Sequence, residues 1–270
     1  AEIVNIYLGM SINYQDKQEV IPVIQNTSNL EYDITSAILK LTRKEKTVIA
    51  FATGQKEYDI YTDAKILREE LSKNYEVRTH SLKSEIGRDV NILVLFGPQD
   101  TFTEENKYHI DQFLMRGGKL VVLFDRVKIV ESPFLIAANL DVQIDDLLKN
   151  YGIKIKKNLV LDVNNEMVPF GGQKFTFFTP YPFFVKIVKD GLNRENPITR
   201  DLQSLTFPWC SEVEIEKKGE DIKVIELVKS SQKSWTQQGQ YNLSPQQSLL
   251  PIGERKPHLL GALILSLIHI

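Results

Sequence analysis

The chain has 270 residues, of which 42% are apolar and 25% charged, and its net charge is −2. These values are ordinary for a globular protein of one large or two modest domains, and the near-neutral charge argues against nucleic acid as a partner. The single cysteine excludes an internal disulfide and a cysteine-based zinc cluster, and the four histidines are scattered. We therefore expect no metal and no cofactor.

The first 45 residues predict a hairpin followed by a helix. Apolar residues alternate on both sides of a polar turn at 14–18, which is typical of a hairpin over residues 2–24. Ser28 and Glu31 then form a capping-box pattern that opens an amphipathic helix. Because the chain starts without Met or a signal sequence, we expect an excised fragment and interpret residues 1–45 as a lead-in unit or the tail of an upstream domain.

Residues 46–125 predict parallel strands joined by helices. Continuous apolar runs at 47–52, 92–96 and 120–124 are typical of buried parallel strands, and a half-alternating run at 75–82 fits a strand nearer the sheet edge. The expected fold class is α/β: a three-layer, doubly wound, mostly parallel sheet of flavodoxin type, with the N-terminal lead-in and added C-terminal strands.

The helix before the last of these strands has clear end signals. Thr103 can cap it, acidic residues occupy its first turn, and a glycine pair at 117–118 ends it. Its apolar residues predict an inward stripe, while His109 is expected to point away from the core.

The loops after these strands should meet at the carboxyl edge of the sheet, where open α/β sheets bind ligands. A nucleophile elbow needs a cysteine or serine directly after a strand, and the loops after Phe96 and Phe124 contain neither there. We predict no catalytic residues and a ligand- or partner-binding corner. Its residues would be Gly54, Gln55, Gly97, Pro98, Gln99, Asp125 and Arg126.

Two residues have competing interpretations. Asp125 could bind a metal or act as a base, although a structural cap together with Arg126 fits it better. Cys210 lies in the strand-like sequence FPWCSEVE, which fits a buried, inert thiol, with a catalytic cysteine as the alternative.

The C-terminal part predicts further strands. A short helix is expected at 141–151, and strands at 153–162, 204–216 and 222–228. The aromatic segment 170–184 either offers a platform for a sugar or peptide, or is an extended core segment whose rings fill a seam between layers.

We predict four regions. Residues 1–45 are the lead-in, 46–229 the α/β domain, 230–257 a flexible polar loop, and 258–270 either a final buried strand or a vector-derived tail. Residues 258–270 have a further alternative interpretation as the start of a membrane segment, although they are fewer than a helix needs to span a bilayer.

Several segments of the sequence resemble those of a known family. They are EVIPVI, NLEYDITSAILKLTR, VIAFATGQKE, YEVRTHSL, VNILVLFGPQDTFTEENKYHIDQFLMRGGKLVVLFD, LVLD and FTPYPFFVKIV. Together they resemble the auxiliary subunit of ABC-type gliding-motility transport systems (GldG-type proteins), over Val4 to Trp235. The central domain is also similar to the GIFT domain of intraflagellar transport proteins, itself similar to class I glutamine amidotransferases.

This resemblance implies an extracytoplasmic domain that works with an ABC-transporter permease and ATPase and is anchored to the cytoplasmic membrane by segments outside this sequence. The amidotransferase Cys-Gly elbow would fall at Gly97-Pro98-Gln99, where this chain lacks the cysteine. The expected function is therefore a non-catalytic, extracytoplasmic accessory domain that binds protein or ligand. The alternative is a carbohydrate- or peptide-active enzyme or a solute-binding module that uses segment 170–184.

Overall fold

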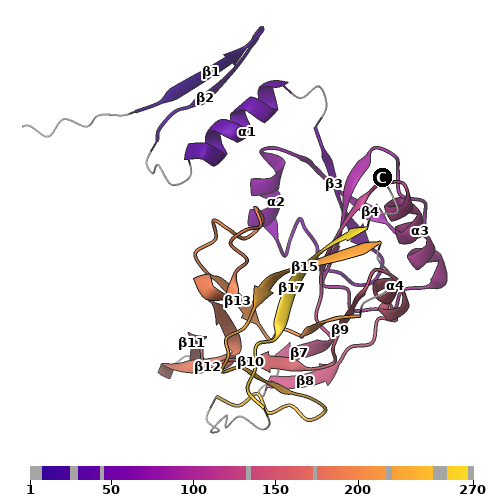
Figure 1. Ribbon diagram of the computed structural model, residues 1–270, viewed down its shortest axis with the longest axis vertical. Helices are drawn as coiled ribbons and strands as arrows, with labels where there is room; N and C mark the ends of the chain where they lie inside the picture. Colours follow the sequence, from indigo (N-terminus) through magenta and orange to yellow (C-terminus); the bar gives the residue numbers. More distant parts are fainter. Residues whose placement is uncertain are drawn as a thin grey trace, which may run out of the picture.

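The computed structural model describes residues 8–24, 30–42, 46–131, 135–172, 175–216, 221–245 and 254–266. Within these residues the chain forms one parallel sheet of four strands and six small antiparallel sheets (Figure 1). Helices are few, and strands account for most of the regular structure. None of the helices in these ranges is both long and apolar enough to cross a membrane.

A hairpin and a helix form in the lead-in, but the hairpin strands are shorter than the predicted span of residues 2–24, of which residues 2–7 lie outside the described residues. Strands β1 (Met10–Tyr14) and β2 (Lys17–Ile21) make an antiparallel hairpin, and α1 (Leu30–Thr42) packs beside it, with Lys40 Nζ 3.1 Å from a carboxylate oxygen of Glu19. Figure 1 shows these three elements standing apart from the parallel sheet. The predicted cap, Ser28, lies outside the described residues.

The four parallel strands are also those predicted. They are β3 (Val48–Thr53), β4 (Glu76–Ser81), β5 (Val90–Phe96) and β6 (Lys119–Leu123), in the order β4-β3-β5-β6. Helix α2 (Lys65–Ser72) lies on one face, and α3 (Glu104–Met115) and α4 (Asp145–Asn150) lie on the other (Figure 1). Each face has its own apolar core, centred on Phe51 and Val94 on the α2 side and on Leu93 and Leu95 on the α3 side.

Helix α3 begins where the sequence predicted, but one of its side chains lies differently. The Thr103 hydroxyl accepts the backbone N–H of Asn106 at 3.2 Å, and the Asn106 side chain accepts the backbone N–H of Thr103 in return, which closes a capping box. His109, predicted to point outward, instead places Nδ1 2.9 Å from the carbonyl oxygen of Leu82. This contact fixes the helix to the end of β4.

The rest of the chain is built from short antiparallel strands. They pair as β7–β8, β9–β14, β10–β16, β11–β12–β13 and β15–β17. Their bounds are β7 (Val127–Glu131), β8 (Leu135–Asn139), β9 (Ile153–Ile155), β10 (Leu159–Leu161), β11 (Asn165–Gly172), β12 (Phe175–Ile187), β13 (Leu205–Pro208), β14 (Val213–Ile215), β15 (Ile222–Lys229), β16 (Trp235–Gln237) and β17 (Leu259–Ser266). A 3₁₀ turn, η2 (Lys189–Gly191), follows β12.

The predicted fold class is therefore wrong. A doubly wound, mostly parallel sheet of flavodoxin type would continue the parallel strands with further strand–helix units, but every strand pair after β6 is antiparallel. The prediction of C-terminal strands was wrong where it assigned one long strand to a stretch that forms two short ones. Residues 153–162 break at a polar Lys-Lys-Asn interruption into β9 and β10, and residues 204–216 break at Trp209, whose φ is 50°.

The aromatic segment 170–184 divides between core and surface. Tyr181 and Phe183 are fully buried in an apolar cluster with Trp235, whereas Phe175 and Phe178 are 85% and 65% exposed. The core interpretation therefore holds for the second half of β12 only. Trp235, from the predicted flexible loop, is buried in β16.

Candidate functional site

The corner predicted from the sequence is held together by Gln55. This residue follows β3 and is 5% exposed. Its carbonyl oxygen accepts the backbone N–H groups of Gln99 and Asp100, both at 2.8 Å, and its side-chain Nε2 donates to Asn106 Oδ1 at 3.1 Å. The backbone carbonyl of Gln55 thus fixes the loop after β3 to the loop after β5, and its side chain fixes that loop to the first turn of α3.

Gly97 allows a close approach of Tyr58 at this corner. Its φ is 63°, and a Cβ atom placed on it would lie 2.4 Å from the Tyr58 ring. The backbone N–H of Tyr58 donates to the carbonyl of Phe96 at 3.0 Å, and the two rings lie 5.4 Å apart. Any side chain at position 97 would displace the Tyr58 ring, so the glycine is required for this packing. The neighbouring Pro98 is buried, and Gly54 is exposed.

A shallow, open hollow of about 570 Å³ lies at this corner. It is lined by Glu57, Tyr58, Asp63, Phe96 and Gln99. The lining combines two aromatic rings with two carboxylates, so its potential is negative and its walls can pack against an apolar or cationic group.

Glu57 gives this hollow an unused hydrogen-bond acceptor. Its Oε2 accepts the backbone N–H of Gln55 at 2.8 Å, whereas its Oε1 is buried and has no hydrogen-bond partner among the described residues. Burial raises the pKa of Glu57 above its ordinary value, although hydrogen bonds from nearby backbone N–H groups oppose this. Asp63, in contrast, already accepts the backbone N–H of Asp59 at 2.8 Å. The group that fits this corner best is therefore a hydrogen-bond donor, and a cationic one in particular.

Asp125 and Arg126, the other two predicted corner residues, turn into the protein. Arg126 is 1% exposed, its Nε donates to the carbonyl of Leu140 at 3.1 Å, and its guanidinium pairs with Asp145 and lies 3.5 Å from Asp141. The structure thus brings together the predicted residues from positions 54–55 and 97–99 in one corner, and it uses 125–126 to connect β6 to α4 and β14.

Asp125 is a buried carboxylate beside a buried thiol. Its Oδ1 accepts the backbone N–H of Ser211 at 2.8 Å, and burial raises its pKa to about 6 despite that hydrogen bond. Burial, together with the charges of Asp125 and Asp162, raises the pKa of the Cys210 thiol well above its ordinary value. A thiol in this setting stays protonated and inert, which agrees with the interpretation of Cys210 as a structural residue.

We predict that Asp125→Asn stabilises the protein at pH 8. The asparagine Oδ1 can still accept the Ser211 N–H, while the buried negative charge is removed. A folded-state pKa of about 6, above the unfolded value, means that the wild-type carboxylate lowers stability as pH rises from about 4 through 6. A rise from 3.8 to about 6 corresponds to at most roughly 3 kcal/mol. Urea unfolding should show a gain of about 1–3 kcal/mol at pH 8 that disappears near pH 4; a loss of stability at pH 8 would contradict this account of Asp125.

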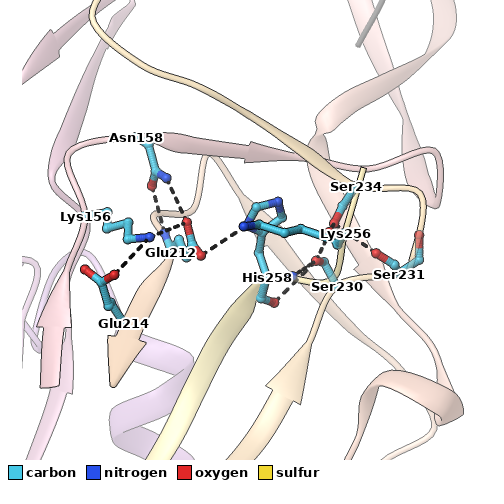
Figure 2. Close-up of polar contacts among 9 residues, drawn as sticks. All are labelled: Lys156, Asn158, Glu212, Glu214, Ser230, Ser231, Ser234, Lys256 and His258. Atoms are coloured by element: carbon cyan, nitrogen blue, oxygen red, sulfur yellow. Dashed lines mark hydrogen bonds and ion pairs between the residues drawn. The ribbon is translucent and has the colours of Figure 1, made fainter. Parts of the chain in front are cut away.

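A second polar network, which the sequence did not reveal, surrounds His258 (Figure 2). The His258 Nδ1 lies 3.2 Å from Glu212 Oε1, and Asn158 Nδ2 donates to Glu212 Oε2 at 3.1 Å. Although burial opposes it, contact with His258, Asn158 and the nearby Lys156 lowers the pKa of Glu212 to about 2. The backbone N–H of His258 donates to the Ser230 hydroxyl at 2.7 Å.

This network connects strands, and its serine is not placed as a nucleophile beside the histidine ring. A histidine, a carboxylate and a serine are the residue types of a hydrolase triad. Here, however, the Ser230 hydroxyl contacts the His258 backbone and the Ser234 hydroxyl, and His258 Nε2 has no hydrogen-bond partner within the described ranges. We interpret the network as the connection that joins β15 to the start of β17. His258 lies 28 residues from Ser230 and 46 from Glu212, and Asn158 lies 54 residues from Glu212, so no local spacing could have revealed the network.

A second hollow lies at the opposite, amino end of the parallel strands. Arg88, Arg116 and Lys119 line it around the glycine pair 117–118. Arg116 is already engaged, since its Nη2 donates to the carbonyl of Ile86 at 2.6 Å. The glycines precede strand β6 and open no helix, so they offer no helix N-terminus to an anion. We therefore regard the carboxyl-end corner as the candidate site.

Comparison with known proteins shows a family and similar proteins. A family model described as an ABC-type uncharacterized transport system, of the auxiliary type, matches residues 46–266. A protein of Borreliella burgdorferi, named only as an uncharacterized protein, is 32% identical over 241 residues, which cover 86% of this chain and 47% of that protein. The chain thus spans about half the length of this relative. A solved structure of the mmIFT52 N-terminal domain is 18% identical with a TM-score of 0.49, covering 73% of this chain and 82% of that one.

Proposed function

The chain belongs to the family of ABC-type transport system auxiliary components, and from this premise we propose that it acts without catalysis, by docking a protein partner at the carboxyl-end corner of its parallel sheet. The partner would be the permease of the same transport system, through which the domain would associate with the ATPase. The proposal also includes an extracytoplasmic position, as the sequence resemblance implies. The assignment to gliding motility stays a prediction.

The observation that carries this proposal is the preformed corner around Gln55. Its loops are fixed by backbone hydrogen bonds of 2.8 Å, so the surface needs no ordering before a partner binds. The hollow beside it is shallow and open, which suits a protruding side chain of another protein better than an enclosed small molecule.

The chemistry of the hollow indicates the group that it would receive. The unpartnered Glu57 Oε1 requires a donor, Asp63 adds negative charge, and the rings of Tyr58 and Phe96 can contact an alkyl chain or a guanidinium. We infer that the partner presents a lysine or arginine side chain. Such a contact should weaken as salt concentration rises.

The same corner gives no support to the enzymatic alternative. The position of the amidotransferase nucleophile is held by Gly97-Pro98-Gln99, and Cys210 is buried outside the hollow. Neither hollow described above includes a residue of segment 170–184. Glu166, whose carboxylate lies beside that segment's strand, is paired with Lys186 at 3.1 Å.

We expect the double variant Tyr58→Ser/Asp63→Asn to lose association with the transporter. The full-length protein would be co-expressed with the permease and ATPase encoded with it, solubilised and purified, and the co-purified subunits quantified. Loss of an aromatic contact and a charge at an interface centre should lower the yield about tenfold or more. The matched control is Tyr108→Ser/Glu105→Gln on α3, whose two side chains are also exposed. Equal yields from the two double variants would refute a docking role for this corner.

A further inference from the structure

The free end of the β11–β12 ribbon exposes a cluster of large apolar side chains. Phe175 is 85% exposed, Phe178 65%, Met167 54% and Phe177 45%. Figure 1 shows this ribbon at the edge of the molecule, directed away from the parallel sheet. Clustered exposure of this kind marks an interaction site, because single exposed apolar residues are common but groups of them are not.

The ribbon end is apolar on both of its faces. Strand register pairs Met167 with Pro180 and Pro169 with Phe178, which places these four on one face. Phe177, paired with Phe170, lies on the other face, and so does Phe175. A partner protein with a flat surface would cover only one face. Two exposed apolar faces suit a medium that surrounds the ribbon end.

The edge of the ribbon is poorly suited to a second copy of this chain. β11 is the outer strand of its three-stranded sheet, and such an edge could add a strand from another molecule. Pro169, near the middle of β11, has no N–H to donate to such a strand and interrupts the ladder. Pairing between copies through this edge is therefore disfavoured.

The charge of the segment selects the kind of surface. From Met167 to Val185 the sequence contains no aspartate or glutamate, and its one charged residue is Lys174. The chain as a whole has a net charge of −2, so this acid-free stretch is a local feature. Exposed aromatic rings in a stretch without acidic residues favour a lipid surface, since the rings can enter the interface and no carboxylate of this stretch repels anionic headgroups.

We propose that the end of the β11–β12 ribbon inserts into the headgroup region of a lipid bilayer and holds this domain against the membrane. Aromatic side chains prefer this interfacial region, and binding strength increases with buried apolar area and with anionic lipid. The core half of the same strand, around Tyr181 and Phe183, anchors the exposed end to the body of the protein. This proposal is independent of the docking corner.

The test is flotation of the purified protein with vesicles of phosphatidylcholine alone and of phosphatidylcholine with one quarter phosphatidylglycerol. We expect binding to both, tighter to the anionic vesicles, and a loss of roughly tenfold or more in the Phe175→Ser/Phe178→Ser variant. The matched control is Tyr61→Ser/Tyr108→Ser, which removes two rings that are 47% and 60% exposed at other sites and should bind vesicles as the wild type does. Thermal unfolding of each variant shows that it is folded.

A second readout reports insertion directly. In Phe178→Trp, brominated lipids should quench tryptophan fluorescence beyond the level seen for the wild type, whose two tryptophans lie in one apolar cluster, Trp235 buried and Trp209 half-buried. Three results would overturn the proposal: no vesicle binding by the wild type, equal binding by the Phe175→Ser/Phe178→Ser variant, or the absence of added quenching. If that variant instead bound vesicles normally but lost a transporter subunit, the ribbon end would be a protein-docking surface.

Discussion

Replacing Arg126 by alanine is expected to lower the free energy of unfolding by about 3–5 kcal/mol. The side chain is 1% exposed and fills the space between β6, α4 and the segment that follows β8, where its Nε donates to the carbonyl of Leu140. The truncation leaves a cavity and removes that hydrogen bond. The carboxylates of Asp141 and Asp145 are about half exposed, so water can solvate them when their partner is gone. Urea or thermal unfolding monitored by circular dichroism measures the change.

Two further variants separate volume from charge at this site. Arg126→Met keeps most of the volume and should cost only about 1–2 kcal/mol, chiefly from the lost hydrogen bond. Asp141→Asn/Asp145→Asn keeps the arginine but leaves its buried positive charge without a counter-charge, so it should cost more than Arg126→Met. A cost below about 1 kcal/mol for Arg126→Ala would show that the guanidinium is not the connection described here.

Tyr181→Ala is expected to destabilise the protein by a similar amount, about 3–5 kcal/mol. The ring is fully buried and contacts the rings of Phe170, Phe183, Phe184 and Trp209, with centroid distances of 5.0–6.3 Å. Its removal would leave a cavity at the centre of the cluster that joins β12 to β10 and β16.

Two further variants serve as comparisons for Tyr181→Ala: one removes only the Tyr181 hydroxyl, and the other changes the exposed end of β12. Tyr181→Phe should cost about 1–2 kcal/mol, because the hydroxyl donates to the buried carbonyl of Leu243 at 2.9 Å. Phe178→Ala, three residues away but exposed, should change stability by no more than about 0.5 kcal/mol. Equal costs for Tyr181→Ala and Phe178→Ala would contradict the division of this strand into a core half and an exposed half.

The parallel strands could be predicted because their signals are local. β3 and β5 are continuous apolar runs, and α3 carries its cap at Thr103, directly before its acidic first turn. The antiparallel part could not be predicted in the same way. Its pairs, such as β9 with β14 and β10 with β16, join segments far apart in the sequence, and periodicity does not report which strand lies beside which.

The candidate site shows the same limit. Gln55 and Gln99 were predicted to meet because parallel strands end at one edge, and they do so through a 2.8 Å hydrogen bond. Glu57 follows β3 as Gln55 does, but the sequence alone fits a solvated loop or helix cap there better; the path of the loop is what places Glu57 and Tyr58 in the hollow. Asp125 and Arg126 follow a strand of the same sheet, yet they turn inward, because Ser211 and Asp145, distant in the sequence, are placed to receive them.

The most direct test of the docking corner is site-specific photo-crosslinking in the assembled transport system. A photoreactive phenylalanine derivative would replace Tyr58 in the full-length protein, and Tyr108 in a matched control, since the two side chains are 51% and 60% exposed. Irradiation of membranes that contain the permease and ATPase should give a crosslinked product with the permease from position 58, reduced at high salt, and none from position 108. Crosslinks from position 108 with none from position 58 would place the contact on another face and contradict the proposed function.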